Sequence, residues 1–96
     1  MNSVELIGIV RQVNIDASSK QYLVLEVNRP YLDKNQALLN DYFKVYRWGI
    51  LDYGIFNNIV VGSQVAIRGH LINKEDETII LSEYVKVLYY PKSIKI

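Results

Sequence analysis

Apolar and polar residues alternate with a period of two over most of this chain. Because successive side chains of a β-strand point to opposite faces, this alternation predicts strands. The predicted strands are Ser3–Val13, Gln21–Pro30, Asp41–Gly49, Gln64–Asn73 and Thr78–Tyr90. Pro30 and Pro91 cannot donate to a strand ladder, so we expect them to end the second and the fifth strand.

The connecting segments have turn or loop composition, except for one predicted helix. Polar turns or loops are expected at residues 14–20, 31–40 and 74–77, and the second of these is compatible with a turn of helix at Gln36–Leu39. Between the third and fourth strands, Leu51, Ile55 and Ile59 recur at four-residue steps, which predicts a short helix.

Three strands, a helix and two further strands form the element order of the OB-fold, a small all-β Greek-key barrel of five strands. Gly8 and Gly69 lie inside predicted strands, where glycine lets a strand bend around a barrel. The nearest alternative is an SH3-like barrel, which has no helix of this length at that position. Ninety-six residues form one hydrophobic core but not two, so we expect a single OB-fold domain over residues 1–96.

The composition argues against several functional classes. The chain has no cysteine and a single histidine, His70, so we expect no disulfide, no metal site and no cofactor. It has no nucleophile–base set and no phosphate-binding glycine motif, so we expect no enzymatic activity. Without a long apolar run or a recognisable signal peptide, a cytoplasmic location is expected. The net charge of +1 is low for a protein that binds duplex DNA by electrostatics.

The third predicted strand, DYFKVYRWG, carries most of the functional information. One face has Tyr42, Lys44, Tyr46 and Trp48, and the other has Phe43, Val45 and Arg47. If the second face is core, the first exposes a row of aromatic rings with a lysine between them. Every nucleic-acid base has a π-face, so such a row binds unpaired bases without reading sequence, and stacking contributes roughly 1–3 kcal/mol per base. The alternative is that both faces are buried, against which Lys44 argues.

Three stretches resemble the bacterial single-stranded DNA-binding protein family: NSVELIGIVRQV, YFKVYRWG and VGSQVAIRGHL. The resemblance covers nearly the whole chain. It implies that bases stack on Tyr42 and Trp48, that Tyr31 provides a further aromatic after the second strand, and that Lys44 is the basic residue of the third strand. It also implies assembly into dimers or tetramers.

Two features depart from the family pattern. The hairpin NKEDET is short and acidic and lacks the aromatic that the family places there. The chain ends in YYPKSIKI rather than in a tail with an acidic tip that recruits partner enzymes, so we expect no such recruitment. Small primosomal replication proteins share the fold without that tail, and the chain is also similar to them in this respect.

The predicted nucleic-acid interface therefore consists of Trp48, Tyr42, Lys44, Tyr31, Tyr46, Arg29 and Arg68. The charges of Arg29 and Arg68 are as well explained by solvation, and Tyr46 by packing in the core or in a subunit interface. Apolar residues on both faces of the first and fifth strands, such as Ile7, Ile80 and Tyr84, predict a homo-oligomer.

The predicted function is binding of single-stranded DNA without sequence specificity, in DNA replication, repair or recombination. A protein-interaction or scaffold domain and a single-stranded RNA-binding protein are the alternatives, because fold alone does not decide function and stacking does not distinguish the sugars.

Overall fold

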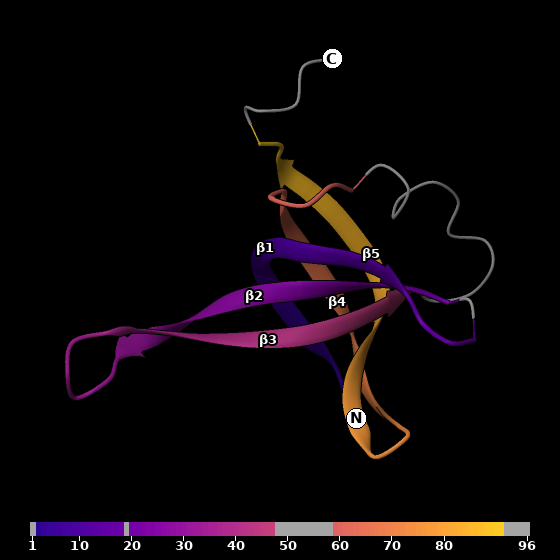
Figure 1. Ribbon diagram of the computed structural model, residues 1–96, viewed down its shortest axis with the longest axis horizontal. Coiled ribbons are helices and arrows are strands. Elements are labelled where there is room, and N and C mark those ends of the chain that lie inside the picture. Colours follow the sequence, from indigo (N-terminus) through magenta and orange to yellow (C-terminus); the bar gives the residue numbers. More distant parts are fainter. Residues whose placement is uncertain (1, 19, 48–58, 92–96) are drawn as a thin grey trace.

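The computed structural model describes residues 2–18, 20–47 and 59–91, which form five strands (Figure 1). The strands are β1 (Val4–Ile15), β2 (Gln21–Leu32), β3 (Leu38–Arg47), β4 (Gln64–Lys74) and β5 (Glu77–Tyr89). They close into a barrel in the order β1-β2-β3-β5-β4, and β3 pairs with β5 in parallel while all other neighbours are antiparallel. This is the predicted five-stranded OB-fold barrel, and all five predicted strands are present.

Several strand boundaries differ from the predicted ones, and two of these differences concern the end of β2 and the start of β3. Proline 30 does not end β2, which continues to Leu32 across an irregularity in its pairing with β3 between Asn28 and Leu32. Proline is tolerated there because the interrupted ladder does not require its missing N–H group.

The strand β3 begins at Leu38, so the prediction of a possible helical turn at Gln36–Leu39 is wrong. The loop is instead a hairpin turn, in which one Asp33 carboxylate oxygen accepts hydrogen bonds from the backbone N–H groups of Asn35 and Ala37.

The predicted helix between the third and fourth strands falls almost entirely within residues 48–58, which lie outside the described residues. Ile59, at its predicted end, is buried in the core. Within the described part of the chain, no helix is long and apolar enough to span a membrane.

The core is built from alternate residues of every strand. Its fully buried side chains include Val10, Leu23, Leu25, Val45, Val65 and Ile80. The parallel β3–β5 pair closes the barrel, and there the buried Ser82 hydroxyl donates a hydrogen bond of 2.9 Å to the Tyr46 carbonyl oxygen. A hydroxyl at this position is satisfied by the backbone and so carries no penalty for burial.

The two glycines lie where backbones approach closely. A Cβ on Gly8 would overlap the backbone oxygen of Glu26, and a Cβ on Gly69 would overlap the backbone carbonyl of Leu81. The β4–β5 register also shifts beside Gly69, because Glu83 is an extra residue on β5. The predicted role of Gly69 at a bend of the barrel is confirmed by this bulge.

Two hairpins extend from the barrel and frame one of its outer faces. The β2–β3 hairpin projects far to the side in Figure 1, and the β4–β5 hairpin forms the lower end. The outer face of β2 and β3 therefore continues from the barrel onto a projecting arm, and this surface carries most of the predicted site.

Candidate nucleic-acid interface

The outer face of β2 and β3 is a ladder of cross-strand pairs. In the antiparallel register, Tyr22 lies opposite Tyr46, Val24 opposite Lys44 and Glu26 opposite Tyr42. The intervening residues of these strands, such as Leu25 and Val45, are fully buried. The prediction that Val45 faces the core and Tyr42 the opposite side is therefore confirmed.

Tyr42 is an open aromatic surface with a fixed hydroxyl. Its side chain is 60% exposed, and its hydroxyl donates a hydrogen bond of 2.8 Å to Glu26 Oε2. Arg11, the extra residue of a β-bulge in β1, donates to both oxygens of the same carboxylate. The hydrogen bonds from Arg11 and, to a smaller extent, from Tyr42 lower the pKa of Glu26. In turn, the hydrogen bond to the Glu26 carboxylate raises the pKa of Tyr42. The ring is thus held at its hydroxyl, while most of the residue is exposed to solvent.

Tyr46 is not an open aromatic surface, contrary to the prediction for this face. Only 7% of it is exposed, and its ring stacks on that of Tyr22 with centroids 5.1 Å apart and an interplanar angle of 25°. The Lys74 ammonium lies over the Tyr46 ring, 4.3 Å from its centroid. The ring is covered because the β1–β2 turn and the β4–β5 hairpin both lean over this end of the ladder, and burial raises the pKa of Tyr46.

Lys44 lies between the open and the covered ends of the ladder. Its ammonium is 3.1 Å from Glu77 Oε1 and 5.4 Å from the centroid of the Tyr22 ring. The hydrogen bond to the Glu77 carboxylate raises the pKa of Lys44. Lys44 is thus on the same face as Tyr42, and its ammonium already has a carboxylate partner.

Beyond Lys44 the ladder ends in a pocket of ≈150 Å³. Its lining includes Asp16 and Ser18 from the β1–β2 turn, the two stacked tyrosines, and Lys44, Lys74 and Glu77. Only Lys44 and Tyr46 of this lining were predicted; Asp16, Ser18, Tyr22, Lys74 and Glu77 were not. Tyr22 could have been found from the period of its strand. Lys74 meets Asp16 across 58 residues of sequence, so no local pattern indicates that contact.

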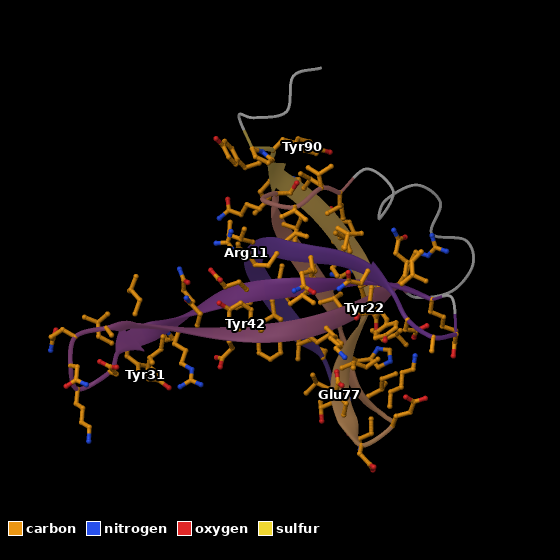
Figure 2. All side chains as sticks on the ribbon, in the orientation of Figure 1. Arg11, Tyr22, Tyr31, Tyr42, Glu77 and Tyr90 are labelled. Atoms are coloured by element: carbon orange, nitrogen blue, oxygen red, sulfur yellow. The ribbon has the colours of Figure 1, made fainter. Side chains whose placement is uncertain are left out.

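Tyr31 and Arg29 lie on the projecting arm. Tyr31 is 58% exposed and farther from the barrel than Tyr42 (Figure 2). The Arg29 guanidinium binds both carboxylate oxygens of Asp41, with a shortest distance of 2.8 Å. Because Asp41 precedes Tyr42 in the strand, this ion pair lies on the side of the arm opposite the Tyr42 ring.

The structure does not bring Arg68 to the same face. Arg68 is on β4, which pairs with β1 and β5 and has no contact with β2 or β3 through the ladder. Its guanidinium lies over the Tyr84 ring, 5.6 Å from the centroid, beside a groove of ≈520 Å³ that Glu5 and Ile7 also line. Trp48 lies outside the described residues.

Four cations on or beside the β2–β3 face and the arm are each matched by a carboxylate. The pairs are Arg11–Glu26, Arg29–Asp41, Lys44–Glu77 and Lys74–Asp16, with N–O distances of 3.1, 2.8, 3.1 and 2.8 Å. These four pairs add no net charge to the surface. The feature that distinguishes this surface is the exposed aromatic area of Tyr31 and Tyr42.

No protein-family model matches the chain, and no curated protein is similar to it in sequence. Solved structures do share its fold. A small single-stranded DNA-binding protein from Mycoplasma pneumoniae matches with a TM-score of 0.66 and 19% identity, over 100% of this chain and 93% of that one. The SSB of Plasmodium falciparum, solved in complex with ssDNA, matches with a TM-score of 0.66 and 18% identity, over 93% and 96% of the two chains.

PriB from Ralstonia solanacearum matches with a TM-score of 0.62 at only 8% identity, over 93% of this chain and 99% of that one. The fold predicted from the resemblance to single-stranded DNA-binding proteins is thus confirmed.

Proposed function

We propose that this protein binds single-stranded DNA without sequence specificity, in replication, repair or recombination, by stacking bases on the β2–β3 face. The observation that carries the proposal is the Tyr42 ring, which is open to solvent while Glu26 and Arg11 hold its hydroxyl. A ring held in this way loses little conformational freedom when a base stacks on it.

The proposed path of the strand follows the aromatic residues. It begins on the arm at Tyr31 and passes Tyr42, with Lys44 close to the phosphate between bases. Trp48, which follows β3 in the sequence, is proposed as a further stacking residue. Arg29 contributes on the arm, where Asp41 and, to a smaller extent, Tyr31 raise the pKa of Arg29. Tyr46 supports the face from below rather than stacking on a base, and Arg68 belongs to a different surface.

Titration with oligo-dT tests the proposal. Trp48 is the only tryptophan, so its emission reports binding directly, and fluorescence anisotropy of a labelled oligonucleotide provides an independent readout. Binding should tolerate moderate salt, since most of the affinity comes from stacking. Duplex DNA of the same length is the control and should bind far more weakly. Equal affinity for duplex and single strand would contradict stacking.

The same titration with oligo-U ranks RNA against DNA as the ligand. If neither oligonucleotide binds at micromolar protein, the OB-fold serves as a protein-interaction or scaffold domain instead.

We propose further that the protein is a homo-oligomer that assembles through the outer face of β1, β4 and β5. Ile7, Tyr84 and Leu88 are 58%, 51% and 43% exposed on these strands. Ile80, which was predicted on this face, is instead buried in the core. Light scattering after size exclusion tests the assembly: wild type should be at least dimeric, and Ile7→Glu should shift it toward the monomer. A monomeric wild type at tens of micromolar would contradict the assembly.

A further inference from the structure

The covered end of the β2–β3 face offers a cation rather than a ring. The Tyr46 ring has Tyr22 on one side and the Lys74 ammonium over it, so neither of its faces accepts a base. Lys74 and Lys44 both line the adjacent pocket. A strand that stacks on Tyr42 and runs along the ladder would therefore meet two ammonium groups at this end. An ammonium group binds phosphate as a point charge and offers no flat surface on which a base could stack.

The position of the pocket suits the next part of such a strand. Tyr42 and Tyr46 are four residues apart on β3, which corresponds to about 13 Å along a strand. Lys44 lies midway between them, and Lys74 is at the far end. The proposed path thus runs from an aromatic surface to a corner within the reach of a short oligonucleotide. The two ammonium groups of this corner lie among the carboxylates of Asp16, Glu75 and Glu77.

Asp16 already occupies the position that a phosphate would take at Lys74. One Asp16 carboxylate oxygen accepts hydrogen bonds of 2.9 Å from the backbone N–H groups of Ser18 and Lys20, which anchors the side chain in the β1–β2 turn. The other oxygen is 2.8 Å from the Lys74 ammonium. The anion is therefore fixed, whereas the lysine has a flexible four-carbon stem and can turn toward another anion.

We propose that Lys74 is a phosphodiester-binding residue of this corner, and that Asp16 is an intramolecular competitor that the nucleic-acid phosphate displaces. The inference rests on the proposed single-stranded DNA binding. It adds a binding residue outside the predicted set and a carboxylate that sets the affinity of the site from within the chain.

The test is a set of four variants titrated with labelled oligo-dT. Asp16→Asn retains the oxygen that caps the turn but removes the charge that holds Lys74, so it should bind about two- to fivefold more tightly, the range for one exposed charge contact. Lys74→Gln should bind weaker by a similar factor. The double variant should resemble Lys74→Gln, because the gain from Asp16→Asn requires the freed ammonium. Asp76→Asn is the matched control, since it removes a negative charge from the β4–β5 hairpin and leaves the Asp16–Lys74 pair intact.

The salt dependence provides a second readout. For a single strand, each phosphate contact contributes about 0.7 to the slope of log affinity against log salt concentration. The slope for Asp16→Asn should accordingly be steeper than that for Lys74→Gln by about this amount. If the ion pair were purely structural, its removal in Lys74→Gln would lower the free energy of unfolding in urea without changing the slope.

The outcomes separate the two proposals. If wild type does not bind oligo-dT, the proposed function fails and this inference fails with it. If wild type binds, the inference alone is overturned by either of two results: Asp16→Asn gains no more affinity than Asp76→Asn, or Lys74→Gln binds with unchanged affinity and slope.

Discussion

Tyr42 and Tyr46 lie on the same side of one strand, yet their truncation should have opposite consequences. Tyr42 is 60% exposed and is the proposed stacking surface. Tyr42→Ala should weaken oligo-dT binding by about 1–3 kcal/mol, which corresponds to roughly 5- to 150-fold in the dissociation constant. Its effect on folding should be small, within about 0.5 kcal/mol, because the ring contributes little to the core.

Tyr46→Ala should instead destabilise the fold. Only 7% of Tyr46 is exposed. Its ring stacks on the Tyr22 ring and lies beneath the Lys74 ammonium. Removing a buried aromatic side chain typically costs about 3–5 kcal/mol. We expect about 3 kcal/mol here, because the ring packs at the edge of the barrel rather than at its centre. The barrel should still fold if its stability lies in the usual range of about 5–15 kcal/mol.

Two measurements on each variant decide between these roles. Urea unfolding followed by circular dichroism gives the free energy of unfolding, and fluorescence anisotropy of labelled oligo-dT gives the dissociation constant under native conditions. The reasoning would be refuted if Tyr42→Ala bound like wild type. It would equally be refuted if Tyr46→Ala lost affinity at wild-type stability, since that result would make the covered ring a stacking surface.

Three further predictions follow from single contacts. Tyr42→Phe keeps the ring and loses only the hydrogen bond to Glu26, so oligo-dT affinity should stay within about threefold of wild type, whereas a loss as large as that of Tyr42→Ala would assign the contact to the hydroxyl. Gly69→Ala should cost about 2 kcal/mol or more in urea unfolding, because the new methyl group overlaps the Leu81 carbonyl; wild-type stability would show that β5 can move aside. The pKa of Asp16 is lowered far below its usual 3.8, mainly by Lys74, so its ion pair stabilises the fold above that value and the stabilisation is lost as the pH falls through the lowered pKa. The free energy of unfolding should therefore decline below about pH 4, and less steeply for Asp16→Asn; identical profiles would show that this pair does not contribute.

The strands were predictable because each has one face in the core. Alternation is a local property, and the buried set that includes Leu25 and Val45 lies where the period of two places it. The bend at Gly69 was predictable for a similar reason, since a glycine inside an apolar strand indicates a bulge or a close approach.

The site was less predictable, because whether a side chain on a strand is covered depends on segments that are distant in sequence. Tyr42 and Tyr46 have the same parity and similar neighbours in sequence, and only the β1–β2 turn and the β4–β5 hairpin make one open and the other covered. The position of Arg68 depends on the strand order around the barrel, which alternation does not contain. Pro30 shows the reverse case: a rule about one residue failed because the neighbouring strand pairing is itself interrupted there.

The pairing of cations with carboxylates bears on which ligand the face prefers. A surface that bound duplex DNA would need unpaired lysines and arginines along a groove, because duplex binding depends on contacts to phosphate. Here four cations of the face and the arm each have a carboxylate within 3.1 Å, so phosphate alone gains little from them. The rings of Tyr31 and Tyr42, in contrast, are exposed to solvent and available for stacking. A ligand that offers both bare π-faces and phosphates gains from the rings first and displaces the carboxylates second, and a single strand is the form of DNA that offers both.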